Sequence, residues 1–542
     1  MKKLLLTVLF TVPLLCFSQD EDAWIYFKDK PNAAAFLSQP LNMLTQRALD
    51  RRAAQNIALD SKDVPVHQAY INQITSTSGI SVKAKSKWLN CLHIRGAISD
   101  INPLINLSFV KKIVFANRNI AQLGTNRSFE TFISTAETKT METTINFNYG
   151  NSANQIQMLN GHLLHQQNFT GDTKIIAVLD AGFPNVNTIA PFQRLRDNNQ
   201  ILGGYNFVDK NNLFYTRNGH GTSVLSTMGG YVENQLVGTA PDAKYYLFIT
   251  EDANSENPVE ESYWVEGAEM ADYFGADIIT SSLGYFGYDN PYYSHSYSDM
   301  TGDKNFASQG ANIAFSRGMV VVASAGNEGG SSEPHVGVPA EATNVLAIGA
   351  VRSNRVYAAF SSIGPSFDNR VKPDVMAQGQ ASVVSSTSGS IATANGTSFS
   401  GPIMAGMIAS FWQAVPWATN IQIVDFVKKA ADMYTNPNPQ YGYGIPDFQK
   451  ALNIANQTSI ASTPSIDFAV FPNPVSTALQ FKIPSNYKQT SFVLFNALGM
   501  LINQTNELIN NQTIDLSGLS NGLYFYKFQS DQGEIKGKLI KN

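Results

Sequence analysis

Three short segments of the 542-residue chain place an acid, a base and a nucleophile in surroundings that suit catalysis. Asp180 follows an apolar run, Ile175–Leu179, so its carboxylate is expected at the tip of a buried strand. His220 lies between two glycines at the start of an expected helix, and Ser398 begins a long apolar helix. A serine hydroxyl becomes a strong nucleophile when a histidine takes its proton and an aspartate orients that histidine. The three residue types therefore predict nucleophilic attack on a carbonyl carbon.

Each of these residues also has an ordinary structural explanation. An aspartate after a strand is often a helix cap, a serine at a helix start is often an N-cap, and a histidine between glycines is most often a loop residue. Their order along the chain is Asp, then His, then Ser, which is the order known for subtilisin among unrelated enzymes with this triad. Three such segments in this order favour catalysis over three separate structural roles.

The stretches around these residues resemble the signatures of the subtilisin-like serine proteases. They are Val178-Leu179-Asp180-Ala181-Gly182, Gly219-His220-Gly221-Thr222 and Gly396-Thr397-Ser398-Phe399-Ser400-Gly401-Pro402. A fourth stretch, Ser324–Gly329, resembles the oxyanion-hole turn of that family, and the resemblance covers roughly residues 147–450. It implies a peptidase whose triad is Asp180, His220 and Ser398, with Asn327 as oxyanion donor. It also implies substrate contacts at Ser282, Leu283, Gly284, Ala325 and Gly326.

Other hydrolytic and metal-dependent chemistries fit the sequence less well. Ser398 lacks the G-x-S-x-G pattern of the α/β-hydrolases because position 400 is Ser. The chain has no H-E-x-x-H segment, and the pair His162 and His165 is interpreted as surface. Calcium is common in the resembled family, but the acidic residues of Glu251–Glu261 are interpreted as a solvated surface loop. We therefore assign no metal and no cofactor, and calcium stays unassigned.

The composition predicts a large folded protein of two to four units. Hydrophobic residues make up 43% of the chain and charged residues 15%, which argues against a disordered protein. The net charge of −4 gives no reason to expect nucleic acid or an anionic membrane as a partner. Between about residues 145 and 456, short apolar runs alternate with helical segments, which predicts an α/β fold with a doubly wound, mostly parallel sheet. In such sheets ligands bind at the carboxyl ends of the strands.

The first eighteen residues have the pattern of a signal peptide. Two lysines precede the apolar run Leu4–Leu15, and cleavage is expected near Ser18. The run is shorter than the roughly 20 residues that a membrane span needs, so no stable membrane insertion is expected. A lipoprotein anchor at Cys16 is the weaker alternative because bulky Leu15 precedes it. Cleavage would leave Cys91 alone, interpreted as a buried apolar residue that can form no intramolecular disulfide.

Residues 19–144 are expected to form a small α+β domain that resembles the propeptide of the same family. A strand is predicted at Ala23–Phe27 and helices at Leu41–Ala58 and Val66–Thr75. The resemblance implies a domain that assists folding and blocks the active site until it is removed. Self-cleavage is expected between about Lys139 and Asn148, and a permanent N-terminal domain is the alternative.

The C-terminal part is expected to be a polar linker, residues 457–467, followed by a small all-β sandwich, residues 468–542. The sandwich resembles the C-terminal sorting domain of the type IX secretion system. The resemblance rests on Phe471-Pro472-Asn473-Pro474, Leu516–Tyr524 and the basic end Lys536–Lys541. A retained carbohydrate- or surface-binding sandwich is the alternative.

Together these features predict a secreted serine endopeptidase made as a zymogen. Its expected partners are protein and peptide substrates and the type IX secretion machinery, and we expect a monomer located outside the cell or at its surface. A catalytically silent binding or adhesion protein with the same fold is the second hypothesis. The Tyr-rich segment Gly284–Tyr297 is expected either to extend the substrate-binding region or to pack as a surface loop.

Overall fold

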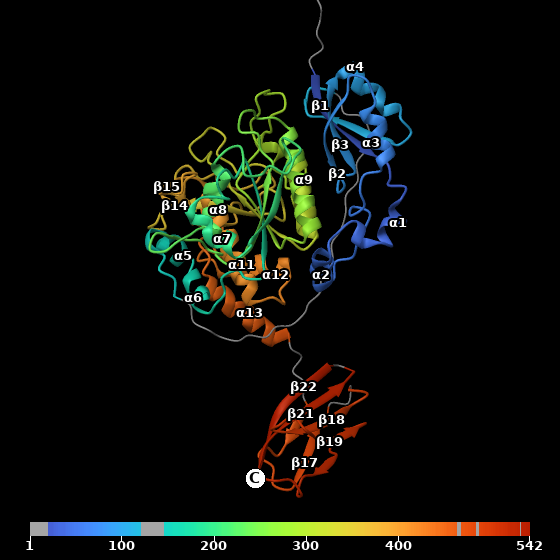
Figure 1. Cartoon of the computed structure of the whole chain (residues 1–542), viewed down its shortest axis with the longest axis vertical. Coiled ribbons are helices and arrows are strands. Elements are labelled where there is room, and N and C mark those ends of the chain that lie inside the picture. The colour runs from blue at the N-terminus through green and yellow to red at the C-terminus, as the bar shows by residue number, and fades with distance from the viewer. Residues whose placement is uncertain (1–19, 121–145, 463–467, 484–486, 532) are drawn as a thin grey trace, which may run out of the picture. The chain divides into compact units, whose positions relative to one another are not determined.

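The computed structural model describes residues 20–120, 146–462, 468–483, 487–531 and 533–542. Its contacts divide the chain into two compact units, Met1–Asn456 and Gln457–Asn542, and each is described by itself (Figure 1). The expected signal peptide and most of the segment expected to be cleaved lie outside the described residues. Among the described residues, no helix combines the length and the hydropathy needed to cross a bilayer.

Residues 20–120 form an α+β domain, called here the N-terminal domain. Its antiparallel sheet has the order β2-β3-β1-β4. The strands are β1 (Asp20–Phe27), β2 (Ser81–Ser86), β3 (Cys91–Ala97) and β4 (Val110–Phe115), and the helices are α1 (Ala33–Leu37), α2 (Gln46–Ala54), α3 (Gln68–Thr75) and α4 (Ile98–Ile101). In β1, the side chains of Ala23, Ile25 and Phe27 enter the core of this domain, whereas Trp24 packs with the central domain. The strand therefore joins the two domains through its two faces.

The helix expected at Leu41–Ala58 is shorter than predicted. Pro40–Asn42 forms a separate 3-10 turn, and α2 begins only after Thr45, whose side chain accepts the N–H of Ala48. The chain leaves the helix before Asn56, which has a positive φ of 52°. Capping and turn residues set these limits more tightly than the apolar pattern alone predicts.

The central domain is built on a seven-stranded sheet of order β13-β12-β11-β10-β5-β9-β6, in which every neighbouring pair is parallel. This confirms the predicted doubly wound α/β fold. Its strands are β5 (Ile175–Asp180), β6 (Ile201–Asn206), β9 (Lys244–Ile249), β10 (Ile278–Ser281), β11 (Val320–Ser324), β12 (Leu346–Val351) and β13 (Val375–Gln378). The short hairpins are β7 (Tyr231–Val232) with β8 (Leu236–Val237) and β14 (Ser382–Ser385) with β15 (Ile391–Ala394).

Helices cover both faces of this sheet (Figure 1). The helices that follow the N-terminal domain are α5 (Ala153–Gln157), α6 (Gly161–Gln166), α7 (Gln193–Asp197), α8 (His220–Gly229), α9 (Val259–Phe274), α10 (Phe306–Ser316), α11 (Thr397–Ala414), α12 (Asn420–Ala430) and α13 (Phe448–Ser462). In β5, Ile176 and Val178 belong to the core under α8 and α11. The alternate residues Ala177 and Leu179 belong to the core under α9 and α10. Burial on both faces explains why this strand is an unbroken apolar run.

The second unit contains the all-β sandwich. Sheet β16-β17-β20 and sheet β19-β18-β21-β22 share one apolar core. The strands are β16 (Ala469–Phe471), β17 (Ala478–Lys482), β18 (Ser491–Asn496), β19 (Leu501–Asn506), β20 (Thr513–Asp515), β21 (Gly522–Ser530) and β22 (Gly533–Lys541). The expected linker at 457–467 begins later than predicted, because α13 continues to Ser462. Its sequence contains no proline or glycine before Pro464, so nothing ends the helix earlier.

Candidate active site

Asp180 and His220 meet at the carboxyl end of β5. Asp180 is fully buried, and its Oδ1 lies 2.7 Å from Nδ1 of His220 and accepts the N–H of Ala181 at 2.8 Å. His220 is the first residue of α8, where its own N–H donates to the Asn218 side chain at 2.9 Å. The negative charge of Asp180 raises the pKa of His220 above its usual 6.5, against the opposing effect of burial. The pair is a histidine held and polarised by a buried carboxylate.

Glycine next to His220 allows this close approach. A Cβ atom at Gly221 would lie 2.5 Å from the carbonyl oxygen of Gly182 and 3.0 Å from Cβ of Asp180. Any larger residue would therefore push α8 away from β5 and lengthen the contact between Asp180 and His220. The glycine in the sequence motif thus has a geometric reason.

Ser398 occupies the first turn of α11. The next residue, Phe399, places its ring centroid 6.1 Å from that of His220, so the serine segment and the histidine are neighbours. Pro402 lies in the second turn of α11. Because proline has no backbone N–H, it cannot donate a hydrogen bond to the Ser398 carbonyl oxygen four residues earlier. The Ser282 hydroxyl donates to this carbonyl oxygen instead, at 3.0 Å. Ser282 thereby supports the turn that presents Ser398.

Asn327 is anchored to the same turn. Its Oδ1 accepts the Thr397 N–H at 2.9 Å and the Thr397 hydroxyl at 3.1 Å, which turns the amide NH₂ group the other way. Thr397 also accepts the Gly326 N–H through its hydroxyl, at 3.2 Å, and its carbonyl accepts the Ser324 hydroxyl at 2.7 Å. Sequence reasoning assigned no role to Thr397. Its position directly before Ser398, within the motif Gly396–Pro402, was the feature of the sequence that could have indicated a role.

The structure brings the remaining predicted site residues to the same sheet edge. Ser282, Leu283 and Gly284 follow β10, and Ala325 and Gly326 follow the neighbouring strand β11. Leu283 and Ala325 are buried, whereas Gly284 is exposed. These two segments therefore flank the first turn of α11 from adjacent strands.

His165 does not lie on the surface, contrary to the sequence interpretation. It is fully buried, with Nδ1 at 2.9 Å from the Tyr149 hydroxyl and Nε2 at 3.1 Å from the Thr239 carbonyl oxygen. Burial lowers the pKa of His165 to about 4, so its ring is neutral at pH 7. Its role is to join helix α6 to two loops, and no metal is required for it.

The acidic residues after β9 were interpreted as a solvated loop, which holds for Glu256 but is wrong for Glu251, Glu260 and Glu261. Glu251, Glu260 and Glu261 are only 8%, 1% and 1% exposed. Glu261 is satisfied by His295 at 2.7 Å, the Tyr288 hydroxyl at 2.8 Å and the Ala307 N–H at 2.9 Å. The first turn of α9 carries Glu260, which accepts backbone N–H groups from the preceding loop, and Glu261, which meets donors from later segments.

The Tyr-rich segment packs between the central and N-terminal domains. Tyr285, Tyr288 and Tyr293 are buried, and the Tyr293 hydroxyl donates to Oε2 of Glu21 in β1 at 2.9 Å. Arg118 donates its backbone N–H to the Tyr292 carbonyl oxygen at 3.2 Å. These contacts agree with the packed-loop alternative, and the N-terminal domain is the surface against which it packs.

The N-terminal domain lies on α9 and makes buried polar contacts with it. Glu269 accepts the Ser86 hydroxyl at 2.6 Å and the backbone N–H groups of Trp88 and Lys87 at 3.0 and 3.1 Å. Asp272, also fully buried, pairs with Arg52 at 2.7 Å and with Arg51. Arg52 additionally pairs with Asp63 of its own domain, at 2.9 Å. The interface thus depends on carboxylates of α9 that are neutralised by the N-terminal domain.

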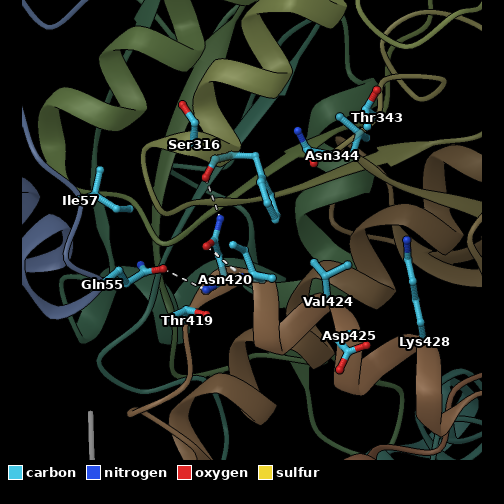
Figure 2. A pocket seen from close by; sticks show the side chains of 13 residues that line it. Gln55, Ile57, Ser316, Thr343, Asn344, Thr419, Asn420, Val424, Asp425 and Lys428 are labelled. Atoms are coloured by element: carbon cyan, nitrogen blue, oxygen red, sulfur yellow. Dashed lines mark hydrogen bonds between the residues drawn. The ribbon is translucent and has the colours of Figure 1, made fainter. Parts of the chain in front are cut away.

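The segment after α2 extends these contacts to the far end of the central domain. Gln55 donates to the Gly318 carbonyl oxygen at 2.8 Å and accepts the Asn420 N–H at 2.9 Å, as Figure 2 shows for Asn420. Gln55 and Ile57 line one side of a cavity of about 350 Å³ whose other walls are α10, α12 and the loop of Thr343, Asn344 and Val345. The N-terminal domain therefore holds the central domain at two separate places.

Comparisons with known proteins identify the three parts of the chain. The model described as "Subtilase family" matches residues 171–444. "Peptidase S8 propeptide domain, Bacteroidota" matches residues 22–131, and "Secretion system C-terminal sorting domain" matches residues 469–542.

Individual relatives agree with the family models. Subtilisin NAT of Bacillus subtilis subsp. natto is 32% identical over 304 residues, 55% of this chain and 70% of that protein. Subtilisin of Bacillus pumilus is 31% identical over 304 residues, 55% of this chain and 97% of that protein. Subtilisin BL of Lederbergia lenta is 32% identical over 293 residues, 53% of this chain and 93% of that protein.

The chain belongs to the subtilase family. It is a serine endopeptidase that carries a propeptide, here the N-terminal domain, and a sorting domain of the type IX secretion system. The sorting domain directs it to the cell surface or the extracellular medium.

Proposed function

We propose that Asp180, His220 and Ser398 form a catalytic triad that hydrolyses peptide bonds through an acyl-enzyme. The observation that carries this proposal is the 2.7 Å contact between Asp180 and His220 beside the turn that presents Ser398. Burial of Asp180 in a low-dielectric site strengthens its interaction with the imidazolium that forms during the reaction.

The first step is attack of Ser398 Oγ on the substrate carbonyl carbon. His220 accepts the hydroxyl proton on Nε2, because Nδ1 is engaged by Asp180. The histidine then donates this proton to the leaving amine, the C–N bond breaks, and an ester to Ser398 remains. Water, deprotonated by His220, hydrolyses the ester and restores the enzyme.

The oxyanion of the tetrahedral intermediate is stabilised from the first turn of α11. The Ser398 N–H has no intrahelical acceptor because it lies among the first four N–H groups of the helix. The Asn327 amide, held by Thr397 through Oδ1, supplies the second donor. The helix dipole adds positive potential at the same place.

Substrate binding and processing complete the proposal. The extended substrate lies between the segment of Ser282, Leu283 and Gly284 and that of Ala325 and Gly326, which follow adjacent strands. The N-terminal domain is removed by self-cleavage between about Lys139 and Asn148. Mass spectrometry of the purified active enzyme tests this step, and an intact N-terminus in active enzyme contradicts it.

The triad is tested with a fluorophosphonate probe, which labels only activated serines, and with a fluorogenic peptide. We expect the label at Ser398, and a loss of turnover of about 10⁴-fold or more in Ser398→Ala. Ser388→Ala is the matched control, because Ser388 is an exposed serine on the β14–β15 turn. Peptide hydrolysis that survives Ser398→Ala contradicts the mechanism. An unlabelled, inactive but correctly processed wild type supports the catalytically silent binding protein instead.

A further inference from the structure

Three glutamates outside the triad, called here the glutamate cluster, converge between β9 and α9. One carboxylate oxygen each from Glu251, Glu256 and Glu260 lies within 4.8 Å of the other two. Glu251 follows β9, Glu256 lies in the loop after it, and Glu260 is in the first turn of α9. Three separate points of the chain thus bring acceptor oxygens to one small volume.

The glutamate cluster lies close to the segment that is expected to contact substrate after β10. The Tyr285 hydroxyl donates to the Glu260 carbonyl oxygen at 3.5 Å, and Tyr285 directly follows the exposed Gly284. On the opposite side, Thr250, the last residue before the cluster, donates its N–H to the Asp180 carbonyl oxygen at 3.1 Å. A substrate that follows the segment after β10 towards the triad therefore passes beside the cluster.

One of these carboxylates has an orphan oxygen. Glu251 is 8% exposed, and its buried Oε2 has no hydrogen-bond partner among the residues that the structure describes. Leaving such an oxygen buried and unsatisfied costs free energy, more so when the group is charged. The oxygen therefore indicates a ligand that brings a hydrogen-bond donor to the cluster.

The surroundings hold the cluster in place but supply no counter-charge. Glu260 accepts the backbone N–H groups of Asp252 at 2.8 Å and Asn257 at 3.0 Å, which fixes the loop around it. Within the described part of the chain, none of the three glutamates makes an ion pair. Burial raises the pKa of Glu251, of Glu256 and of Glu260, the last to about 8, so a cation that enters the cluster favours the ionised carboxylates.

We infer that Glu251, Glu256 and Glu260 bind the ammonium group of a lysine side chain of the substrate. A lysine ammonium carries three N–H donors and no acceptor. Three oxygens that each accept one of these donors at about 2.8 Å, in tetrahedral directions, lie about 4.6 Å apart, and the three observed oxygens agree with this spacing. The guanidinium of arginine holds its donors in one plane and fits three converging oxygens less well.

The cluster is open to solvent on one side. Glu256 and Asp289 are exposed there, and the Glu256 N–H donates to Oδ2 of Asp289 at 3.2 Å, which adds a fourth carboxylate at the rim. The four-carbon stem of lysine lets its ammonium group reach the buried oxygen of Glu251 while the substrate backbone stays at the surface. This inference rests on the proposed function, because it assigns a class of substrate to that peptidase.

The preference is measured on the active enzyme purified from cells that express the full chain. Mass spectrometry of a digested peptide library identifies the cleaved sequences. A matched pair of fluorogenic peptides then carries lysine or norleucine, which lacks the ammonium group, at the selected position. We expect kcat/KM for the lysine peptide to exceed that for the norleucine peptide about 10- to 100-fold, because hydrogen bonds to charged groups discriminate this strongly.

The test variant carries Glu251→Gln and Glu256→Gln, and Glu260 is kept because its carboxylate also holds two backbone N–H groups. The matched control carries Glu233→Gln, an exposed glutamate on the β7–β8 turn. In the test variant, the ratio of kcat/KM between the lysine and norleucine peptides should fall at least about tenfold. In the control, the ratio should equal that of the unchanged enzyme.

The outcomes separate this inference from the proposed function. An enzyme that is labelled at Ser398 by the fluorophosphonate probe and cleaves peptides without a lysine preference overturns this inference alone. An enzyme that is neither labelled nor active overturns the proposed function and this inference with it. An equal fall of kcat/KM for both peptides in the test variant leaves their ratio unchanged, which overturns the inference and assigns the glutamates to the stability of the loop. Preference for arginine over lysine overturns the assignment of an ammonium ligand.

Discussion

Replacement of Asp272 by Asn should markedly weaken inhibition of the peptidase by the N-terminal domain, although Asp272 lies on α9 and is not a triad residue. Asp272 is fully buried, and within the described residues its ion pairs are to Arg51, Arg52 and Lys87 of the N-terminal domain. In the separated peptidase the same carboxylate has none of these partners. The substitution therefore lowers the stability of the complex between the two domains much more than it lowers the folding stability of the peptidase alone.

The magnitude follows from what remains after the substitution. Breaking a buried ion pair by removing one partner costs about 3–5 kcal/mol. Arg52 keeps Asp63 and Arg51 keeps the Ala276 carbonyl oxygen, so we expect the low end, about 3 kcal/mol. Because each 1.4 kcal/mol is a factor of ten, the inhibition constant should rise about 100-fold.

The assay is inhibition of mature enzyme by the separately produced N-terminal domain, followed with a fluorogenic peptide. Glu266→Gln on the same helix is the control. Among the described residues of the N-terminal domain, its carboxylate accepts only the exposed N–H of Lys85, at 3.2 Å. The inhibition constant should therefore change less than about fivefold. An increase below fivefold for Asp272→Asn would refute the assignment of binding energy to this buried network.

Three further predictions concern the pH profile, the serine turn and the sorting domain. As pH falls through the pKa of His220, kcat/KM should decline, because the protonated ring cannot accept a proton; the charge of Asp180 places this midpoint above 6.5, which a pH–rate profile measures. Ser282→Ala should destabilise the chain by about 1–3 kcal/mol in denaturant unfolding, because a carbonyl loses its donor. Added Pro402→Ala should recover part of this loss by supplying an N–H, and equal stability of the single and double variants would contradict the argument. Phe492→Ala should cost the sorting domain about 3–5 kcal/mol in its own thermal transition, with unchanged peptide hydrolysis, since the two units have separate cores.

The sequence was sufficient to predict those parts of the fold in which the local hydrophobic pattern determines the secondary structure. The short apolar run before Asp180 predicted a strand buried on both faces, and several such runs alternating with helical segments predicted the parallel sheet. Asp180 and His220 are in contact because a strand end and a helix start fix their places, and Asn327 accepts hydrogen bonds from Thr397, the residue before Ser398. Limits of helices were less well predicted, as the shorter α2 and the longer α13 show.

Burial that depends on a second domain could not be predicted from local pattern. Glu261 lies in a polar stretch that is typical of exposed loops, yet later segments bury it, and Glu269 is buried by donors from the N-terminal domain. Likewise, Ser282 gained a partner only because Pro402 leaves a carbonyl free across the fold. Both cases depend on contacts between residues far apart in sequence, which no single segment encodes.

The buried carboxylates of α9 have a consequence for the order of folding. Glu266, Glu269 and Asp272 recur every three residues, so on the isolated helix they repel one another along one face. This helix is the crossover between β9 and β10, and the parallel sheet cannot close until it forms. Arg51 and Arg52 of the N-terminal domain pair with Asp272, which reduces this repulsion when the domain is in place. After the proposed removal of this domain, a peptidase that unfolds would lack these partners for refolding, so we expect the lifetime of the mature enzyme to be set by its rate of unfolding.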